Sequence, residues 1–273
     1  MTFTAINLTS RTGTEIKSDR AALLSGAYTK EIRDLLEQRG ALVFRDLHLT
    51  DEEQLAFSES IGDIIPRSDG KKGVYKITLD KNENEEAEIL LGTFYWHIDG
   101  TVLEVPNRAS MLSARRLSPT GGQTEIANTY AAYEELPEAE KKTIDRLRIV
   151  HSQVAIQRLV YPNATAAQVE YWSSKYGHKT HPLVWTHKSG RKSLLVGYTA
   201  DRIEGVTPDE SRALMDRLMT WATQPQFVYH HEWRVGDLLI WDNTGVMHRV
   251  TPYATDSGRM MHRTTLVGEE AIA

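Results

Sequence analysis

Two histidines and one aspartate of this chain occupy positions from which they could hold a single metal ion. His97 and Asp99 lie in the run YWHIDGT, residues 95–101 of the 273 in the sequence. On an extended backbone, residues i and i+2 point to the same face, so a strand end could present both side chains to one ion. A lone HxD pair is common by chance and is weak evidence for a metal site. The prediction therefore depends on a third ligand from elsewhere in the chain.

His248 is the candidate for the third ligand. It follows a hydrophobic run and a polar turn in the segment GDLLIWDNTGVMHR, residues 236–249. Two histidines and one carboxylate leave three positions around an ion open, and this is the ligand set of non-haem Fe(II) oxygenases. Zinc also accepts two histidines and a carboxylate, so the ligand types alone leave a metal-dependent hydrolase as an alternative.

Two arginines lie on one face of a predicted strand. In the run GRMMHRTTLV, residues 258–267, strand alternation places Arg259 and Arg263 on the same side. Guanidinium groups on an inward face are costly unless each meets an anion, and their planar fork suits a carboxylate. Four residues at roughly 3.3 Å each separate them by about 13 Å, so we expect them to hold two different anions. For Arg263, an ion pair with a buried carboxylate of the protein is the alternative.

The elements that position these residues follow from hydrophobic spacing and capping. Capping boxes formed by Thr50 with Glu53 and by Thr207 with Glu210 begin two of the predicted helices. Many short strands with helices to one side, without regular strand–helix alternation, predict a mainly β fold with flanking helices (α+β), a jelly-roll sandwich of the kind found in cupins. Helices are predicted over 28–38, from 50, and over 137–147, 164–176 and 207–223; strands are predicted over 41–44, 73–79, 109–114, 123–127, 183–185, 193–196, 227–231, 237–241, 247–250 and 260–267.

The sequence has the organisation of one domain. No repeat, low-complexity tract or Pro/Gly-rich linker interrupts residues 1–273, and we expect a helical insertion at about 129–180. The acidic run DKNENEEAE, residues 80–88, leads directly into the metal motif. We interpret it either as a solvated loop or as part of a lid, residues 80–92, over the pocket.

Composition excludes several classes of partner and chemistry. The absence of cysteine excludes disulfides, thiolate nucleophiles and iron–sulfur clusters. A net charge of -5 argues against nucleic acid as a partner, and no apolar run reaches the roughly 18 residues of a membrane span. The first residues lack the apolar core of a secretory signal, so we expect a cytoplasmic protein.

The ordered set of motifs resembles the taurine/2,4-dichlorophenoxyacetate dioxygenase (TauD/TfdA) family, a branch of the Fe(II)/2-oxoglutarate oxygenases. The resemblance runs from about Glu31 to Val267. Thr124 lies 25 residues after Asp99, and Arg259 and Arg263 lie 11 and 15 residues after His248, as in the family. The motifs are WHIDGT at 96–101, GGQTEIAN at 121–128, WDN at 241–243 with HR at 248–249, and the two arginines.

The resemblance implies a role for each candidate residue. His97, Asp99 and His248 would form the catalytic facial triad that holds Fe(II). Thr124 and Arg259 would bind the distal carboxylate of 2-oxoglutarate, and Arg263 would bind the acidic group of the primary substrate. The implied fold is a distorted double-stranded β-helix, a jelly-roll variant. The resemblance is also compatible with a homodimer or homotetramer.

The implied reaction uses O2 and 2-oxoglutarate to hydroxylate an unactivated C–H bond of a small anionic compound, such as a sulfonate, aryloxy acid or sulfate ester, releasing succinate and CO2. Retention of Asp99 favours hydroxylation over halogenation. Residues 61–70 lack the histidine of sulfonate-using members, and Thr93 replaces their asparagine, so taurine is not the expected substrate. An amino-acid derivative or natural-product intermediate remains an alternative. A non-catalytic jelly-roll binding protein is an alternative from another class.

Overall fold

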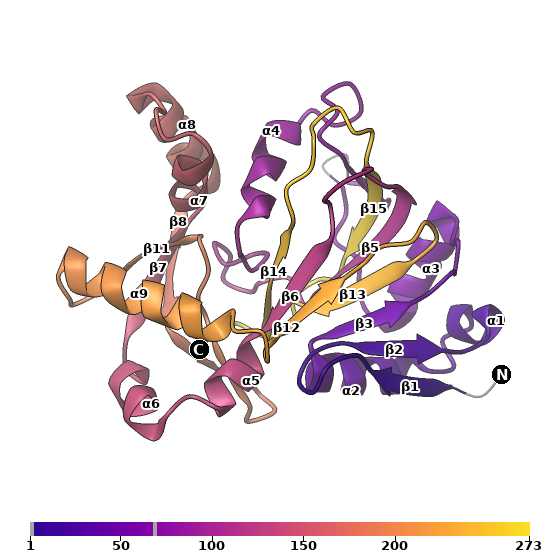
Figure 1. Cartoon of the computed structure of the whole chain (residues 1–273), viewed down its shortest axis with the longest axis horizontal. Coiled ribbons are helices and arrows are strands. Elements are labelled where there is room, and N and C mark those ends of the chain that lie inside the picture. Colours follow the sequence, from indigo (N-terminus) through magenta and orange to yellow (C-terminus); the bar gives the residue numbers. More distant parts are fainter. Residues whose placement is uncertain (1–2, 68–69) are drawn as a thin grey trace.

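A seven-stranded sheet forms the framework on which the rest of the chain packs (Figure 1). The computed structural model describes residues 3–67 and 70–273. A second, three-stranded sheet packs against one face of the first. In spatial order the main sheet contains β1 (Thr4–Asn7), β2 (Thr14–Lys17), β3 (Ala41–Phe44), β13 (Leu238–Asp242), β5 (Ala109–Arg116), β15 (Met260–Thr265) and β4 (Tyr75–Ile77), and the second sheet contains β12 (Val228–His231), β6 (Thr124–Asn128) and β14 (Val246–Val250).

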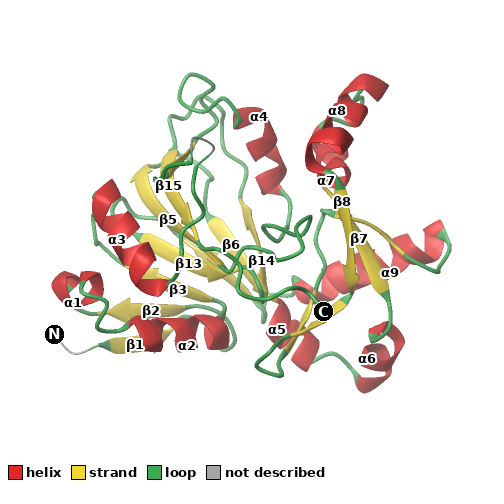
Figure 2. Cartoon of the chain, turned by 180° about the vertical axis from the view of Figure 1, so that it is seen from behind, coloured by secondary structure: helices red, strands yellow, loops and turns green. Residues whose placement is uncertain are grey.

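Strand alternation explains why the central strands are hydrophobic throughout. In β13, Leu238 and Ile240 pack against helices on the outer face, whereas Leu239 and Trp241 pack against the second sheet. The residues of β3 alternate in the same way. Figure 2 shows the three helices that cover the outer face. They are α1 (Arg20–Leu24), α2 (Thr29–Arg39) and α3 (Asp51–Ile61).

A third part of the molecule packs on the far side of the second sheet, with its helices to the left in Figure 1. Its hydrophobic cluster surrounds the fully buried Trp185 and includes Ala127 and Met247 of the second sheet. This part contains α5 (Thr129–Glu134), α6 (Glu138–Ile144), β7 (Arg148–Ser152), α7 (Gln153–Val160), α8 (Ala166–Tyr176), β8 (His178–Pro182), β9 (Val184–Thr186), β10 (Lys192–Leu194), β11 (Ala200–Ile203) and α9 (Pro208–Ala222).

The predicted mainly β architecture with flanking helices is confirmed, and so are the local signals that set its helix ends. The side chains of Thr50 and Thr207 each accept from the backbone N–H three residues on, and the backbone N–H of each threonine donates to the glutamate carboxylate of the capping box. Gly40 ends α2 with a φ of 73°, a left-handed conformation that favours glycine.

The expected helical insertion at 129–180 contains α5 to α8 but also two strands, β7 and β8, which pair with each other. In β7, the four residues from Ile149 to Ser152 are all buried, so the strand has no polar–apolar alternation from which to predict it. The other elements that were not individually predicted have only four to eight residues each. They are β1, β2, β11, α1, α4 (Ala87–Leu90), α5 and α7. Tertiary packing rather than local pattern stabilises such short elements.

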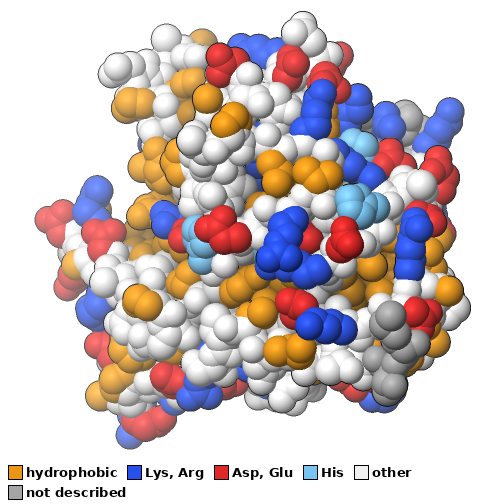
Figure 3. All heavy atoms as spheres, turned by 45° about the vertical axis from the view of Figure 1, so that its right-hand side comes forward, with side chains coloured by type: hydrophobic (Ala, Val, Ile, Leu, Met, Phe, Trp, Pro, Cys, Tyr) orange, Lys and Arg blue, Asp and Glu red, His pale blue; other side chains and the backbone are white. Residues whose placement is uncertain are grey.

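The surface carries mixed charge. On the face shown in Figure 3, lysine and arginine side chains are interspersed with acidic ones. Exposed pairs such as Lys30 with Asp34, 2.5 Å apart, are screened by solvent and add little, so burial of the three apolar clusters dominates stability. Among the residues described, no helix has the length and apolar character that a membrane crossing requires.

His151, in β7, is a buried group whose protonation opposes folding. Its ring is fully buried, and its Nδ1 lies 2.9 Å from Thr199 Oγ1. Burial lowers the pKa of His151 to about 3, below the value of about 6.5 in an unfolded chain. The unfolded chain therefore binds the extra proton first, and the stability that neutral His151 allows is lost as pH falls below about 6.5.

We expect the pH dependence of stability to change in the variant His151→Gln. Between pH 7.5 and 5.5, the wild-type free energy of unfolding should fall by about 1.4 kcal/mol more than that of the variant, because only the wild type has this histidine to protonate on unfolding. Urea unfolding at both pH values measures the difference. Equal losses in the two proteins would contradict the assignment.

Candidate functional site

The two predicted ligand histidines lie opposite each other on paired backbone segments. His97 N donates to His248 O at 3.0 Å, and His248 N donates to His97 O at 2.9 Å. This isolated antiparallel bridge brings the imidazole centroids within 4.2 Å. The prediction that His97 and Asp99 lie at a strand end is therefore wrong. The 3-10 helix η1 (Leu91–Phe94) precedes His97 and a turn at Gly100 follows, which leaves room for one bridge only.

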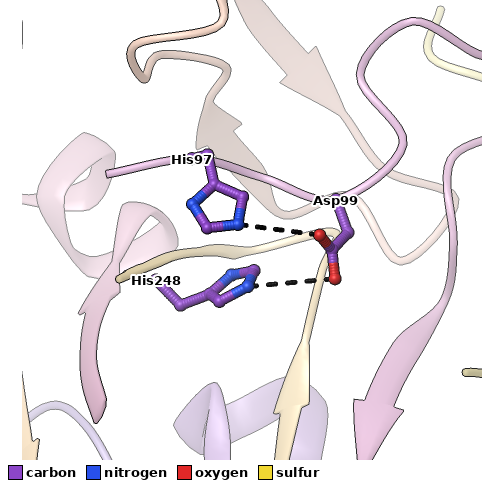
Figure 4. A group of neighbouring side chains, drawn as sticks. All are labelled: His97, Asp99 and His248. Carbon is purple, nitrogen blue, oxygen red and sulfur yellow. Dashed lines mark ion pairs between the residues drawn. The ribbon is translucent and has the colours of Figure 1, made fainter. Parts of the chain in front are cut away.

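Asp99 completes the cluster from the turn that follows His97 (Figure 4). His97 Nε2 lies 3.7 Å from Asp99 Oδ1, and His248 Nε2 lies 3.8 Å from Asp99 Oδ2. One ligand atom from each residue lies within 4.8 Å of the others. These separations are too long for direct hydrogen bonds. Three ligand atoms that face a common point in this way form the arrangement that one cation would satisfy.

The protonation of these side chains suits metal binding. His97 Nδ1 lies 2.8 Å from the carbonyl oxygen of Tyr95, which accepts its proton and leaves the Nε2 lone pair free. Burial lowers the pKa of His248 to about 3, so its ring is neutral. Burial alone would raise the pKa of Asp99, but its interactions with the His248 ring and the Arg263 guanidinium, together with a Ser110 hydrogen bond, lower that pKa to about 2. At neutral pH the cluster therefore offers the Asp99 carboxylate and the neutral His248 ring beside His97 Nε2.

The histidines open into a small cavity with a largely apolar lining. Apart from the ligand histidines, its polar groups are threonine and tyrosine hydroxyls, the Trp241 indole and three guanidinium groups. The cavity is lined by Ile77, Leu90, Thr93, His97, Leu112, Thr124, Trp241, His248, Arg249, Val250, Tyr253, Arg259 and Arg263. All the predicted site residues except Asp99 therefore line one cavity, and Asp99 borders it beside the histidines.

Thr124 and Arg259 offer hydrogen-bond donors without an anion to receive them. Arg259 is 3% exposed, and its Nη2 donates to Gly122 O at 3.0 Å while its buried Nε has no partner in the described structure. Trp233 Nε1 donates to Thr124 Oγ1 at 3.1 Å, so the threonine hydroxyl keeps its own proton to donate. Burial lowers the pKa of Arg259, a cost that a bound anion would offset. The pair fits one end of a carboxylate ligand.

Gly122 makes room for this arrangement. A Cβ at this position would lie 2.8 Å from Arg259 Nε, and the φ of 81° is itself strained for any other residue. The Arg259 guanidinium also lies over the Tyr253 ring, 4.8 Å from its centroid. Arg259 is therefore held from two sides by backbone and aromatic groups, and not by a carboxylate of the described residues.

Arg263 lies on the other side of the cluster, close to the metal-ligand candidates. Its Nη1 is 3.9 Å from Asp99 Oδ2, and its Nε is buried without a hydrogen bond among the groups described. The alternative role for Arg263, an ion pair with a protein carboxylate, is present only as this long contact with Asp99. Its remaining donors are available to a ligand.

Sequence reasoning missed three residues that shape the site. Ser110 donates to Asp99, Trp233 orients Thr124, and Tyr253 packs on Arg259. Ser110 could have been found as a polar residue in the predicted strand 109–114, which is buried on both faces. Tyr253 and Trp233 lie in irregular segments, where no periodic pattern marks a side chain that points inward.

The segment considered as a lid contacts the α7–α8 hairpin. Leu90 and Thr93 line the cavity. Tyr161 Oη donates to Glu88 O at 3.5 Å on the outer side of this segment. Shortly after it, Tyr95 Oη donates to Leu159 O at 3.3 Å. The segment is thus part of the cavity wall, and its opening and closing stay a prediction.

Comparison with known proteins gives consistent matches over nearly the whole chain. The family model described as "Taurine catabolism dioxygenase TauD, TfdA family" matches residues 6–265. The chain is 35% identical over 244 residues to an (S)-phenoxypropionate/alpha-ketoglutarate-dioxygenase of Sphingobium herbicidovorans, covering 84% of this chain and 83% of that one. It is 34% identical over 265 residues to an alpha-ketoglutarate-dependent 2,4-dichlorophenoxyacetate dioxygenase of a Burkholderia species, covering 90% and 87%.

Comparison with solved structures agrees with the sequence matches. A crystal structure of AAD-2 in complex with Mn(II) and N-oxalylglycine superposes with a TM-score of 0.86 at 32% identity, covering 100% of both chains. Similarity of this extent in both sequence and fold, over a chain that brings two histidines and an aspartate together, establishes the relationship. The chain belongs to the TauD/TfdA family of dioxygenases.

Proposed function

We propose that this protein is an Fe(II)- and 2-oxoglutarate-dependent dioxygenase that hydroxylates an unactivated C–H bond of a small anionic organic substrate. The observation that carries the proposal is the convergence of His97, Asp99 and His248, with ligand atoms within 4.8 Å, beside a cavity that holds unpaired arginine donors. Family membership and the names of the relatives, which act on phenoxy acids, support the same class of substrate.

The two histidines and Asp99 would hold Fe(II), and a set of three protein ligands would leave room for co-substrate and oxygen. Bound Fe(II) and 2-oxoglutarate supply the oxidising power, because activation of O2 is coupled to decarboxylation of the co-substrate to succinate and CO2. The hydrogen bond from His97 Nδ1 to Tyr95 O keeps that ring in one tautomer and one orientation.

Arg259 and Thr124 bind the distal carboxylate of 2-oxoglutarate. The Arg259 Nε–H and the Thr124 hydroxyl are two cavity donors that lack acceptors among the described residues. A metal-dependent hydrolase would leave this buried cation without a role. A non-catalytic binding protein would have no need for three metal-ligating side chains at one point.

Arg263 binds the acidic group of the primary substrate. Its distance of 3.9 Å from Asp99 supports this role, because an acidic group held there would lie close to the metal-ligand candidates. Ile77, Leu112 and Val250 line the same space with apolar surface, which suits the hydrocarbon body of the substrate and excludes water. Aryloxy acids, sulfonates and sulfate esters with such a body are the substrates to test.

A release assay tests the proposal as a whole. Purified protein with Fe(II), 2-oxoglutarate and O2 is expected to release succinate faster when an aryloxy acid, alkyl sulfate or sulfonate is added. Under anaerobic conditions, Fe(II) with 2-oxoglutarate should give the visible charge-transfer band of the chelate. Folded protein that gives neither the band nor succinate with any of these compounds would refute the proposal.

Replacement of a metal ligand should abolish metal binding without unfolding the protein. His248→Ala is expected to weaken Fe(II) binding by more than about 100-fold, because one of three ligands is lost. His262→Ala is the matched control, since its ring hydrogen-bonds Asp51 at 2.7 Å and does not line the cavity. Anaerobic titration with Fe(II) measures both affinities. Equal affinities in the two variants would show that the metal does not bind through His248.

Replacement of the two arginines should affect different compounds, the co-substrate for Arg259 and the primary substrate for Arg263. Arg259→Gln is expected to raise the KM for 2-oxoglutarate by roughly 10- to 100-fold, the value of lost charge-assisted hydrogen bonds, while Arg263→Gln raises the KM for the primary substrate instead. Each variant serves as the control for the other. Succinate release at varied concentrations of each compound measures both constants, and an identical pattern in both variants would contradict the assignment.

A further inference from the structure

A chain of buried hydrogen bonds runs from the main sheet to the carboxylate of Asp99. Trp241 Nε1 donates to Asn243 Oδ1 at 2.8 Å, Asn243 Nδ2 donates to Ser110 Oγ at 3.1 Å, and Ser110 Oγ donates to Asp99 Oδ2 at 3.0 Å. Ser110 and Asn243 are fully buried and Trp241 is 2% exposed. Water therefore does not compete for the first two of these bonds, and the third, to the Asp99 carboxylate, is partly buried.

The direction of every bond in this chain is determined. An indole N–H can only donate, so the Asn243 oxygen must face Trp241 and its NH2 group must face Ser110. The serine oxygen accepts from that NH2 group, so its own proton points to Asp99 Oδ2. The chain thus delivers one hydrogen bond to one carboxylate oxygen, Oδ2. Oδ1 receives no hydrogen bond among the residues described.

The main sheet sets the geometry of the chain. Ser110 on β5 and Trp241 on β13 are direct cross-strand partners, and Asn243 follows the end of β13 with its backbone N–H bonded to Arg108 O at 3.1 Å. The Trp241 ring also packs against His248, with centroids 4.6 Å apart. Asp99 itself lies in a turn outside the sheet. A rigid sheet therefore restrains the rotation of a carboxylate that its own turn would leave free.

We propose that Trp241, Asn243 and Ser110 are positioning residues that fix the Asp99 carboxylate, so that Oδ1 is the oxygen presented to the metal. The inference rests on the proposed function, in which Asp99 is a metal ligand. A carboxylate that binds through one oxygen leaves three metal positions open, which a chelating 2-oxo acid and O2 together require. A carboxylate that turned to bind through both oxygens would occupy one of those positions.

The test is Mn(II) binding to the metal-free protein, measured by calorimetry, with thermal unfolding measured on the same samples. Ser110→Ala removes the last donor and is expected to weaken Mn(II) binding by roughly 10- to 100-fold, the usual effect of losing a hydrogen bond to a metal ligand. Ser113→Ala is the matched control. Ser113 is a buried serine of the same strand, and its hydroxyl donates to Gln54 Oε1 at 2.6 Å, away from the cluster. Both variants should lose similar thermal stability, but only Ser110→Ala should lose metal affinity.

A second variant changes the direction of the Ser110 hydrogen bond and removes no side-chain group. Asn243→Asp keeps the size of the side chain and an acceptor for Trp241, but the new carboxylate cannot donate, so Ser110 turns its proton away from Asp99. We expect weaker Mn(II) binding and an altered visible spectrum of the Co(II)-loaded protein, a signature of ligand geometry that lost stability alone would not produce.

The outcomes distinguish the positioning role of Ser110 from the existence of the metal site. Wild-type affinity and a wild-type Co(II) spectrum in Ser110→Ala, or an equal loss in Ser113→Ala, would overturn the positioning role while the metal site stands. Failure of the wild-type protein to bind Mn(II) or Fe(II) at all would overturn the proposed function, and the positioning role with it.

Discussion

Two backbone hydrogen bonds between His97 and His248 determine where the chemistry of this molecule takes place. Residues 95–101 form neither a helix nor a strand, and the bridge to β14 is the contact that places their side chains beside the second histidine. Since the bridge pairs the residues directly, both imidazoles emerge on the same side at close range. Asp99, two residues later, then needs only the turn at Gly100 to reach the same point.

The sandwich of two sheets makes this arrangement stable and gives it a dry cavity. β13 and β5 supply apolar side chains to both faces, and the main sheet also supports polar side chains that no water reaches. Each such group carries a cost unless it is paired, and most are paired within the protein. The exceptions include the Nε groups of Arg259 and Arg263, two side chains that line the cavity, so a bound anion would meet donors that the protein leaves unpaired there.

Much of the fold and the site could be predicted because the signals are local or ordered along the chain. Capping boxes, apolar strands and the order of His97, Asp99, Thr124, His248 and Arg259 are all readable from the sequence. What could not be predicted depends on distant contacts. The strands β7 and β8 exist because they pair with each other, His97 has a single bridge instead of a strand, and Ser110 meets Asp99 only through tertiary structure. Periodicity carries no information about such partners.

The contact between the α7–α8 hairpin and residues 88–95 has a consequence for how such proteins diverge. The metal-ligand candidates depend on the sheets, whereas Leu90 and Thr93, which face the cavity, lie in a segment braced from outside by Tyr161 and Leu159. One part of the cavity wall is therefore separate from the sheets that hold the metal-ligand candidates. Substitutions in the hairpin can reshape that part of the wall without touching the three metal-ligand candidates.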